Sequence, residues 1–325
     1  MQFRLSTGES TSCGQKKIKN QVSSKPQNRT RPAFMTEPIN PTELTTAAQR
    51  AQRSAASTPP AVRAYGRFNA LGLWTLYKRE VARFLTVWKQ TLVAPIVQTL
   101  LFMTVFQLAF GNRGNLSGDF EGLAYGDFLA PGLLIMAILQ NAFANSSSSL
   151  VIAKVQGSHV DFLMPPLSPL ELTMGFIAGA ATRGLLVALI AGVAIHLSPL
   201  ADLPLKQPLA ILWFGLCAAI TLGALGAMGG IWADKFDNLA TISNFVIVPL
   251  TFLSGTFYDI NVLSEPFLTL SLFDPFFYII DGFRFGFLGA ANSNLAIGAA
   301  VTGGLAFLCS AGVWWMFRTG YKLKA

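Results

Sequence analysis

The segment LAILWFGLCAAITLGALGAMGGIW, residues 209–232, is one of six long apolar runs in the chain and contains no charged residue. A helix needs roughly 20 mainly apolar residues to cross a hydrocarbon core of about 30 Å. The other five runs also have this length, at 91–110, 128–150, 172–197, 239–258 and 295–317. Because lipid offers no partner to backbone N–H and C=O groups, each run must be helical. The sequence therefore predicts an all-α membrane protein with six transmembrane helices.

The composition agrees with this fold class. Of the 325 residues, 52% are apolar and only 12% are charged, and the mean hydropathy is +0.48. A soluble domain carries about twice that share of charge, so an ordinary water-soluble enzyme is excluded. Three cysteines and two histidines are too few for a disulfide framework or a zinc cluster. We expect no catalytic residue and no metal site.

The net charge of +8 is concentrated at one end of the chain. Residues 1–90 hold 15 of the 24 Lys and Arg, and Arg318, Lys322 and Lys324 follow the last span. Basic residues mark the cytoplasmic side of a membrane protein. This distribution indicates membrane topology, not nucleic-acid binding, and predicts that both termini are cytoplasmic.

Residues 1–67 lack any apolar period and are rich in Ser, Thr, Gln, Asn, Pro and basic residues. We expect this tail to be disordered, because it buries too little surface to offset its ordering entropy. Two interpretations remain for the first 34 residues: an organelle transit peptide, or an extension without function that precedes Met35. Residues 68–325 form the expected transmembrane domain.

A short amphipathic helix is predicted before the first span. Apolar residues gather on one side of the stretch, and Trp74, Arg79, Glu80 and Arg83 are among its aromatic and charged members. We expect it to lie along the cytoplasmic interface with its basic groups facing anionic lipid. A simple topology signal is the alternative.

Two connections on the cytoplasmic side carry candidate contacts for a soluble partner. The connection 151–171 mixes apolar and polar residues and is bounded by prolines, which favours either a short docking helix or a plain turn. Its candidates are Lys154, Gln156, Gly157, His159, Asp161, Phe162 and Met164. The connection 233–238 is shorter and contributes Asp234, Lys235 and Asp237.

The connection 259–294 is too apolar for an ordinary loop and too interrupted for a full span. Its aromatic and aliphatic residues are interrupted by charged residues and a proline: Asp274, Pro275, Asp281 and Arg284. We favour a re-entrant helical hairpin, because broken backbone survives at membrane depth where protein or water satisfies it. A seventh span at about 267–288 is the alternative.

Arg183 is predicted to lie near the middle of the third span. A charged residue at that depth is costly and by default suggests a function, such as lining a substrate path or contacting an anionic group. A structural arginine bound to carbonyl groups of a neighbouring helix is equally compatible with the sequence.

The energy source is not encoded in this chain. No Asp, Glu or Lys lies within the six runs, which disfavours ion coupling, and there is no Gly-x-x-x-x-Gly-Lys-Ser/Thr phosphate loop. Any energy from ATP must therefore come from a separate protein.

The order of these features resembles the ABC-2 type permeases, the membrane subunits of ATP-binding-cassette exporters. The resemblance covers residues 68–325 and is strongest at PLTFLSGTFY (249–258) and DPFFYIIDGFRFGFLG (274–289). The latter is similar to a family signature in which Pro275, Tyr278 and Arg284 occupy the characteristic places. Residues 153–166 are similar to the segment that contacts the ATPase, although the family's acidic pair is replaced by His159, Val160 and Asp161.

The resemblance implies a permease homodimer with two copies of a separate ATPase, which binds ATP and Mg, while this chain binds no cofactor. The substrate would move outward along the interface between the two permeases; it would be a lipid, a lipo-oligosaccharide or other glycan, or an amphiphilic drug. The membrane would be a bacterial inner membrane, with an organelle membrane as a minor alternative. The connection 151–171 would be the main ATPase contact, and the stretch from Asp274 to Arg284 would gate the outer side. Candidate path residues are Arg183, Asn244, Phe245, Phe252 and Phe257.

Two functions of other kinds stay open at this point. The chain is alternatively an ion-coupled or uncoupled transporter, or a membrane scaffold that transports nothing. Co-purification with an ATPase distinguishes both from the first interpretation.

Overall fold

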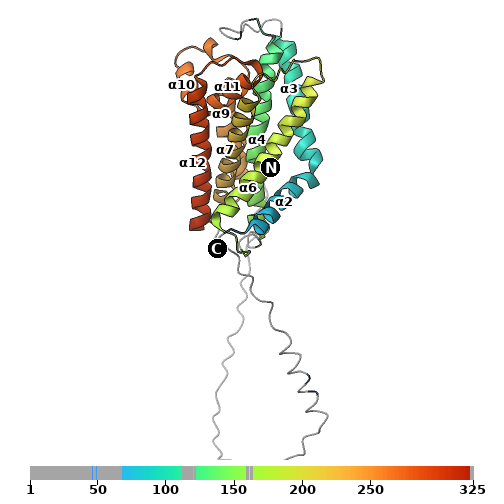
Figure 1. Cartoon of the computed structure of the whole chain (residues 1–325), viewed down its shortest axis with the longest axis vertical. Coiled ribbons are helices and arrows are strands. Elements are labelled where there is room, and N and C mark those ends of the chain that lie inside the picture. Colours follow the sequence, from blue (N-terminus) through green and yellow to red (C-terminus); the bar gives the residue numbers. More distant parts are fainter. Residues whose placement is uncertain are drawn as a thin grey trace, which may run out of the picture. The chain divides into compact units, whose positions relative to one another are not determined.

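The computed structural model describes Thr46, Gln49, residues 68–111, Phe120, 122–158, Asp161 and 164–322. The predicted disordered tail therefore lies outside the described residues, apart from Thr46 and Gln49. Within the described part, every regular element is helical (Figure 1). The helices are α2 (Ala70–Thr86), η1 (Lys89–Val93), α3 (Ala94–Phe110), α4 (Tyr125–Val155), α6 (Pro169–His196), α7 (Pro208–Trp232), α8 (Phe236–Ile242), η3 (Ser243–Ile247), α9 (Val248–Leu253), η4 (Ile260–Val262), α10 (Phe267–Phe273), α11 (Pro275–Leu288) and α12 (Leu295–Thr319).

Six of these helical stretches are long and apolar enough to cross a membrane, which confirms the predicted number. They are Lys89–Phe110, Tyr125–Val155, Pro169–His196, Pro208–Trp232, Phe236–Leu253 and Leu295–Thr319. Two contain a π-helical segment, η1 in the first and η3 in the fifth. Such segments are rare and often lie at functional sites.

The fifth span ends earlier than the sequence predicts. Its helix stops at Leu253 instead of Tyr258, because Gly255 adopts a left-handed backbone with φ of 76°. Residues 254–258 therefore form a turn, and Phe257 lies outside the span.

The segment 267–288 is not one continuous helix, so a seventh straight span is wrong. It is broken at Asp274 into α10, with 7 residues, and α11, with 14 residues. Asp274 is the N-cap of α11 and Pro275 is its first residue, which is the usual position of a helix-starting proline.

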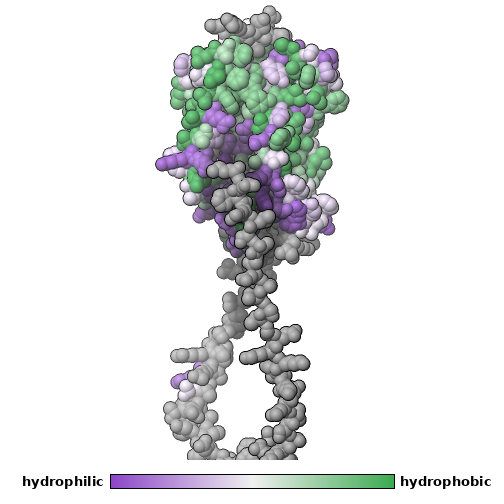
Figure 2. Space-filling model, turned by 180° about the vertical axis from the view of Figure 1, so that it is seen from behind, coloured by the Kyte–Doolittle hydropathy of each residue, from purple (hydrophilic) through white to green (hydrophobic). Residues whose placement is uncertain are grey.

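The two ends of the helix bundle differ. The α2 helix and the end of α12 lie at one end, here called the α2 end, and α10 and α11 lie at the other, the α11 end (Figure 1). Figure 2 shows hydrophobic residues over much of the visible face near the α11 end, whereas hydrophilic residues gather toward the α2 end. This distribution fits a bundle whose long helices face lipid.

The α4 helix is the central element. Of its most apolar stretch, 83% is buried, against 17% for the first and fifth spans. It packs mainly on α7 and α6. The first and fifth spans are thus held by fewer contacts than the rest of the bundle.

Glycines allow the close approach of α6 and α7 to their neighbours. A Cβ atom on Gly226 would meet the carbonyl oxygen of Phe143 and the hydroxyl of Ser146, both on α4. A Cβ atom on Gly179 of α6 would lie 2.6 Å from Cβ of Glu80 on α2. Small residues at such contacts are typical of transmembrane helix packing.

Candidate functional site

The α2 helix turns Glu80 and Arg83 toward the bundle, which corrects for Arg83 the expectation that the basic groups face lipid. Its buried face consists of Leu76, Glu80 and Phe84, spaced four residues apart. Glu80 is only 2% exposed. Trp74 and Arg79 are exposed, as an interfacial helix requires.

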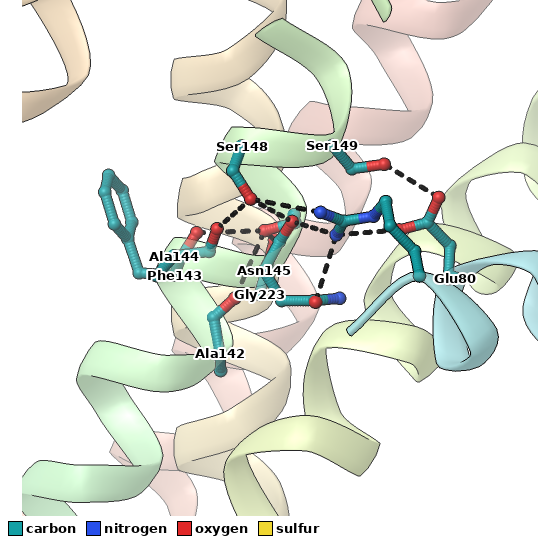
Figure 3. Close-up of polar contacts among 10 residues, drawn as sticks. Glu80, Ala142, Phe143, Ala144, Asn145, Ser148, Ser149 and Gly223 are labelled. Atoms are coloured by element: carbon teal, nitrogen blue, oxygen red, sulfur yellow. Dashed lines mark hydrogen bonds and ion pairs between the residues drawn. The ribbon is translucent and has the colours of Figure 1, made fainter. Parts of the chain in front are cut away.

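Glu80 and Arg83 bind a polar stretch of α4, and Figure 3 labels Glu80 with its partner Ser149. Arg83 donates from Nη2 to the backbone oxygen of Asn145 at 2.8 Å, to its Oδ1 at 3.0 Å, and to Glu80 Oε2 at 3.2 Å. The hydroxyl of Ser149 donates to Glu80 Oε1 at 2.7 Å, and Arg83 Nη1 donates to Ser148 Oγ at 3.3 Å. A buried ion pair needs such additional hydrogen bonds to offset its desolvation.

The same stretch of α4 also binds α7. Ser146 donates to the backbone oxygen of Gly223 at 2.7 Å (Figure 3). The polar cluster of Glu80, Arg83, Asn145, Ser146, Ser148 and Ser149 therefore connects three helices: α2, α4 and α7.

Arg183 lies on α6 beside this cluster. It is buried, and its Nη2 donates to Oδ1 of Asn141 on α4 at 3.2 Å. Within the described residues its Nε finds no acceptor. Among the described residues, the side-chain amide of Asn141 holds the arginine, and no backbone carbonyl group of a neighbouring helix does.

A cavity of about 470 Å³ lies between α3, α4 and the fifth span. Asn141 forms part of its wall, which connects Arg183 to the cavity through one hydrogen bond. The lining combines amides and hydroxyls with apolar side chains; it includes Gln98, Thr99, Phe102, Met136, Gln140, Asn141, Ser243, Asn244 and Phe252. No Asp, Glu, Lys or Arg belongs to this lining, so the cavity suits a polar but uncharged group beside an apolar one.

The candidate path residues are thus only partly brought together. Asn244 and Phe252 line the cavity, and Arg183 lies behind its wall. Phe245 is 78% exposed on another face of the fifth span. Phe257 is buried between α3 and the fifth span, with its ring 4.6 Å from that of Phe106 and 4.8 Å from that of Phe252.

At the α2 end, Lys154 joins the two candidate partner-binding connections. Its ammonium group donates to the backbone oxygen of Ile231 and, at 3.1 Å, to that of Ala233. It also lies 3.8 Å from Oδ1 of Asp234. The other carboxylate oxygen of Asp234, Oδ2, lies 3.3 Å from Nζ of Lys322. The C-terminal end of α7, where carbonyl groups lack helical partners, is thereby capped by two lysines.

The other end of the first connection is fixed by Glu171. This buried carboxylate accepts from the backbone N–H of Ser168 at 2.6 Å, completing the capping box of α6. It also accepts from the backbone N–H of Asn69, the N-cap of α2. One side chain therefore binds the first residues of both helices, and the connection is anchored at its start by Lys154 and at its end by Glu171.

The remaining candidates in these connections are exposed. Gly157 ends α4 with φ of 70°, and Met164 is 79% exposed. Gln156, Asp161, Lys235 and Asp237 are exposed as well, whereas His159 and Phe162 lie outside the described residues. The described candidates between the two anchors, Gln156, Gly157, Asp161 and Met164, thus form an exposed surface.

At the α11 end, the candidate gate residues hold the turn after the fifth span. Arg284 is buried, and its Nη2 donates to the backbone oxygen of Gly255 at 2.9 Å. Its guanidinium carbon lies 3.8 Å from the ring centre of Phe128. Asp274 accepts from the hydroxyl of Ser254 at 2.7 Å, while Tyr278 is half-buried. Burial raises the pKa of Asp274, although bonds from the N–H of Phe276 and from Ser254 oppose this.

Several members of these clusters were not candidates from the sequence: Asn141, Asn145, Ser146, Ser148, Ser149, Glu171 and Lys322. The run of four serines after Asn145 was a possible signal, because consecutive hydroxyls inside a transmembrane helix need partners. Glu171 had a local signal too, since Ser168 followed three residues later by Glu is a capping-box pattern.

Comparisons with known proteins agree with this architecture. The family model of the ABC-2 type transporter matches residues 72–288. The chain is 33% identical over 221 residues to the inner membrane transport permease YadH of Escherichia coli (strain K12), covering 67% of this chain and 84% of the relative. It is 26% identical over 238 residues to nodulation protein J of Rhizobium leguminosarum bv. viciae, covering 71% and 87%.

The chain therefore belongs to the ABC-2 type transporter family and is an integral membrane protein of the permease type. The match begins within α2 and ends at the last residue of α11. The polar cluster, the cavity, Lys154, Glu171 and Arg284 all lie inside it.

Proposed function

We propose that this chain is the membrane subunit of an ABC exporter in a bacterial inner membrane. It moves an amphiphilic substrate outward, and a separate ATPase subunit, present in two copies, binds ATP and Mg and supplies the energy. The main support is the connection between α4 and α6, in which the described residues Gln156, Gly157, Asp161 and Met164 are exposed between the anchors Lys154 and Glu171. A force on this surface would be transmitted from α4 to α7 by the hydrogen bonds of Lys154, and from α6 to α2 by those of Glu171.

The proposed substrate path includes the 470 Å³ cavity. Its amides and hydroxyls suit sugar or headgroup oxygens, and Phe102, Met136 and Phe252 suit an apolar chain. A lipid, a lipo-oligosaccharide or other glycan, or an amphiphilic drug meets this description. The inner-membrane location rests on the name of the Escherichia coli relative.

We propose further that two copies of the chain pair in the membrane. The first and fifth spans have the least buried apolar stretches, and Val97, Leu101 and Phe245 are exposed on them. A symmetric pair with these spans at its centre would place two of the cavities close together.

The ATPase contact is tested by replacing residues 156–161 with a Gly/Ser sequence. The altered permease is expected to fold but to lose its ATPase during purification in detergent, because the open surface between the anchors is removed while Lys154 and Glu171 remain. Co-purified ATPase is measured by gel densitometry and mass spectrometry. The matched control replaces residues 112–117, another six-residue stretch, which in the sequence lies between α3 and α4. Equal ATPase recovery from both variants contradicts the proposed contact.

The membrane orientation is a second expected outcome. We propose that the α2 end is cytoplasmic, that α2 lies along that interface, and that α10 and α11 form a re-entrant hairpin entering from the outside. The support is the break at Asp274 and the short length of both helices. A reporter fused after Ala325 should be read in the cytoplasm, as should one fused before Phe68. Opposite locations for the two reporters would refute an even number of crossings.

A further inference from the structure

A second cavity, of about 380 Å³, lies on another face of the fifth span. Its wall is formed by α4, α7, α8, η3, α9, α11 and α12, and includes Phe143, Met228, Trp232, Val246, Leu250 and Met316. All of its lining residues are apolar or aromatic except for the small Gly229. We call it the apolar groove.

The apolar groove opens toward the membrane near the α2 end. Trp232 is the last residue of α7, and Met316 lies in the last turn of α12. Trp232 and Val246 are 46% and 49% exposed, although both form part of the wall. The groove therefore reaches from the lipid-facing surface between the ends of α7 and α12 to the interior near Phe143.

A basic group lies beside the end of the groove. Nζ of Lys322 lies 5.4 Å from the ring centre of Trp232 and donates to the backbone oxygen of that residue at 2.9 Å. Its side chain is 36% exposed. Lys154 and Lys322 face the single carboxylate of Asp234, so these three described groups together carry one positive charge.

We propose that the apolar groove binds an anionic phospholipid of the surrounding membrane. One acyl chain lies in the groove, and the headgroup phosphate lies near Lys322. The volume falls within the roughly 300–1,000 Å³ of ordinary ligand sites. Basic pockets between transmembrane helices on the cytoplasmic side typically bind acidic headgroups, and tryptophan belongs at that level of the bilayer.

The bound chain also has a structural consequence. Ile242, Val246, Ile247 and Leu250 of the fifth span line the groove, and this span has few other contacts. An acyl chain in the groove supports this span on one face, while the polar cavity lies on another. The groove and the polar cavity share no lining residue, so variants in the groove test lipid binding there separately from transport.

The experiment uses the purified full chain in detergent, with phosphatidylglycerol and phosphatidylcholine of identical acyl chains as probes. Native mass spectrometry counts retained lipids per chain, and thermal unfolding reports stabilisation. We expect retention of phosphatidylglycerol in preference to phosphatidylcholine and a higher unfolding temperature with the anionic lipid. Lys322→Gln should reduce this preference roughly fivefold, the factor expected for one basic residue near a membrane surface, and Lys322→Arg should retain it.

A second variant tests the groove itself. A Cβ atom on Gly229 would lie 3.7 Å from Leu239 and 3.8 Å from Phe143, which are ordinary contacts with side chains, so the backbone here accepts a Cβ atom and Gly229→Leu is expected to fill the groove. It should abolish retention of phosphatidylglycerol. The controls are Gly304→Leu, at an open position of α12, and Lys78→Gln, an exposed lysine of α2.

Three outcomes overturn the proposal. They are equal retention of the two lipids by the unaltered chain, undiminished retention by Gly229→Leu, and a change of oligomeric mass in Gly229→Leu without any change in lipid count. The last result assigns the groove to a contact between two copies of the chain. Size-exclusion chromatography of each variant verifies folding, and Val246→Trp replaces Gly229→Leu should the latter not fold.

Discussion

Replacement of Glu80 by alanine is expected to destabilise the protein by about 2–3 kcal/mol. The carboxylate is 2% exposed and accepts from both Arg83 and Ser149. Its removal leaves the charge of Arg83 without its ion-pair partner, and breaking a wholly buried pair costs about 3–5 kcal/mol. The Arg83 side chain keeps 27% exposure and its bonds to Asn145, which reduces the loss. The free energy of unfolding is measured by denaturant titration in mixed micelles.

Two further variants isolate the ion pair. Arg79→Ala, at an exposed position of the same helix, should change the stability by no more than about 0.5 kcal/mol. The double variant Glu80→Ala, Arg83→Ala should lose less unfolding free energy than the two single variants lose together, because neither charge is then left unpaired. Equal effects of Glu80→Ala and Arg79→Ala would show that the polar cluster does not hold α2 in place.

Replacement of Gly226 should disrupt the contact between α4 and α7. A Cβ atom there would meet the backbone oxygen of Phe143 and the hydroxyl of Ser146. Since a backbone carbonyl cannot rotate away, the two helices must separate, and the bond from Ser146 to Gly223 is weakened. Overpacking of this kind costs about 1–3 kcal/mol for Gly226→Ala and more for Gly226→Leu.

The matched control for this change lies on α12. Gly304→Ala places the same methyl group where no atom lies within 4 Å, and the better helix propensity of alanine should leave stability unchanged or slightly higher. Thermal unfolding of both variants provides the comparison. A stable Gly226→Ala protein would mean that α4 and α7 approach less closely than described.

The number and approximate limits of the spans were predictable from the sequence because length and lack of charge determine them directly. The end of the fifth span was not, since residues 254–258 are apolar enough to continue a helix. What ends the helix is the left-handed backbone of Gly255, whose carbonyl group accepts from Arg284, 29 residues later. Hydropathy contains no information about such a distant partner.

The candidate site was predictable only in part, and for a related reason. The helical period of apolar residues shows which residues of α2 share a face. It does not show whether a neighbouring helix offers that face a polar partner. Glu80 was therefore placed only on an interfacial helix, whereas its carboxylate accepts a hydrogen bond from Ser149 of α4 inside the bundle. Lys154 and Asp234 were both candidates, but their proximity depends on how α4 and α7 end side by side.

The shared carboxylate of Glu171 limits how the helices move. It binds the backbone N–H groups of both Asn69 and Ser168, so α6 cannot rock at this end without taking α2 with it or breaking one of these bonds. In the proposed export cycle, a tilt of α6 at this end is therefore expected to move α2 as well. A fluorescent label at the exposed Trp74 position is accordingly expected to report a tilt of α6 when the proposed ATPase binds nucleotide.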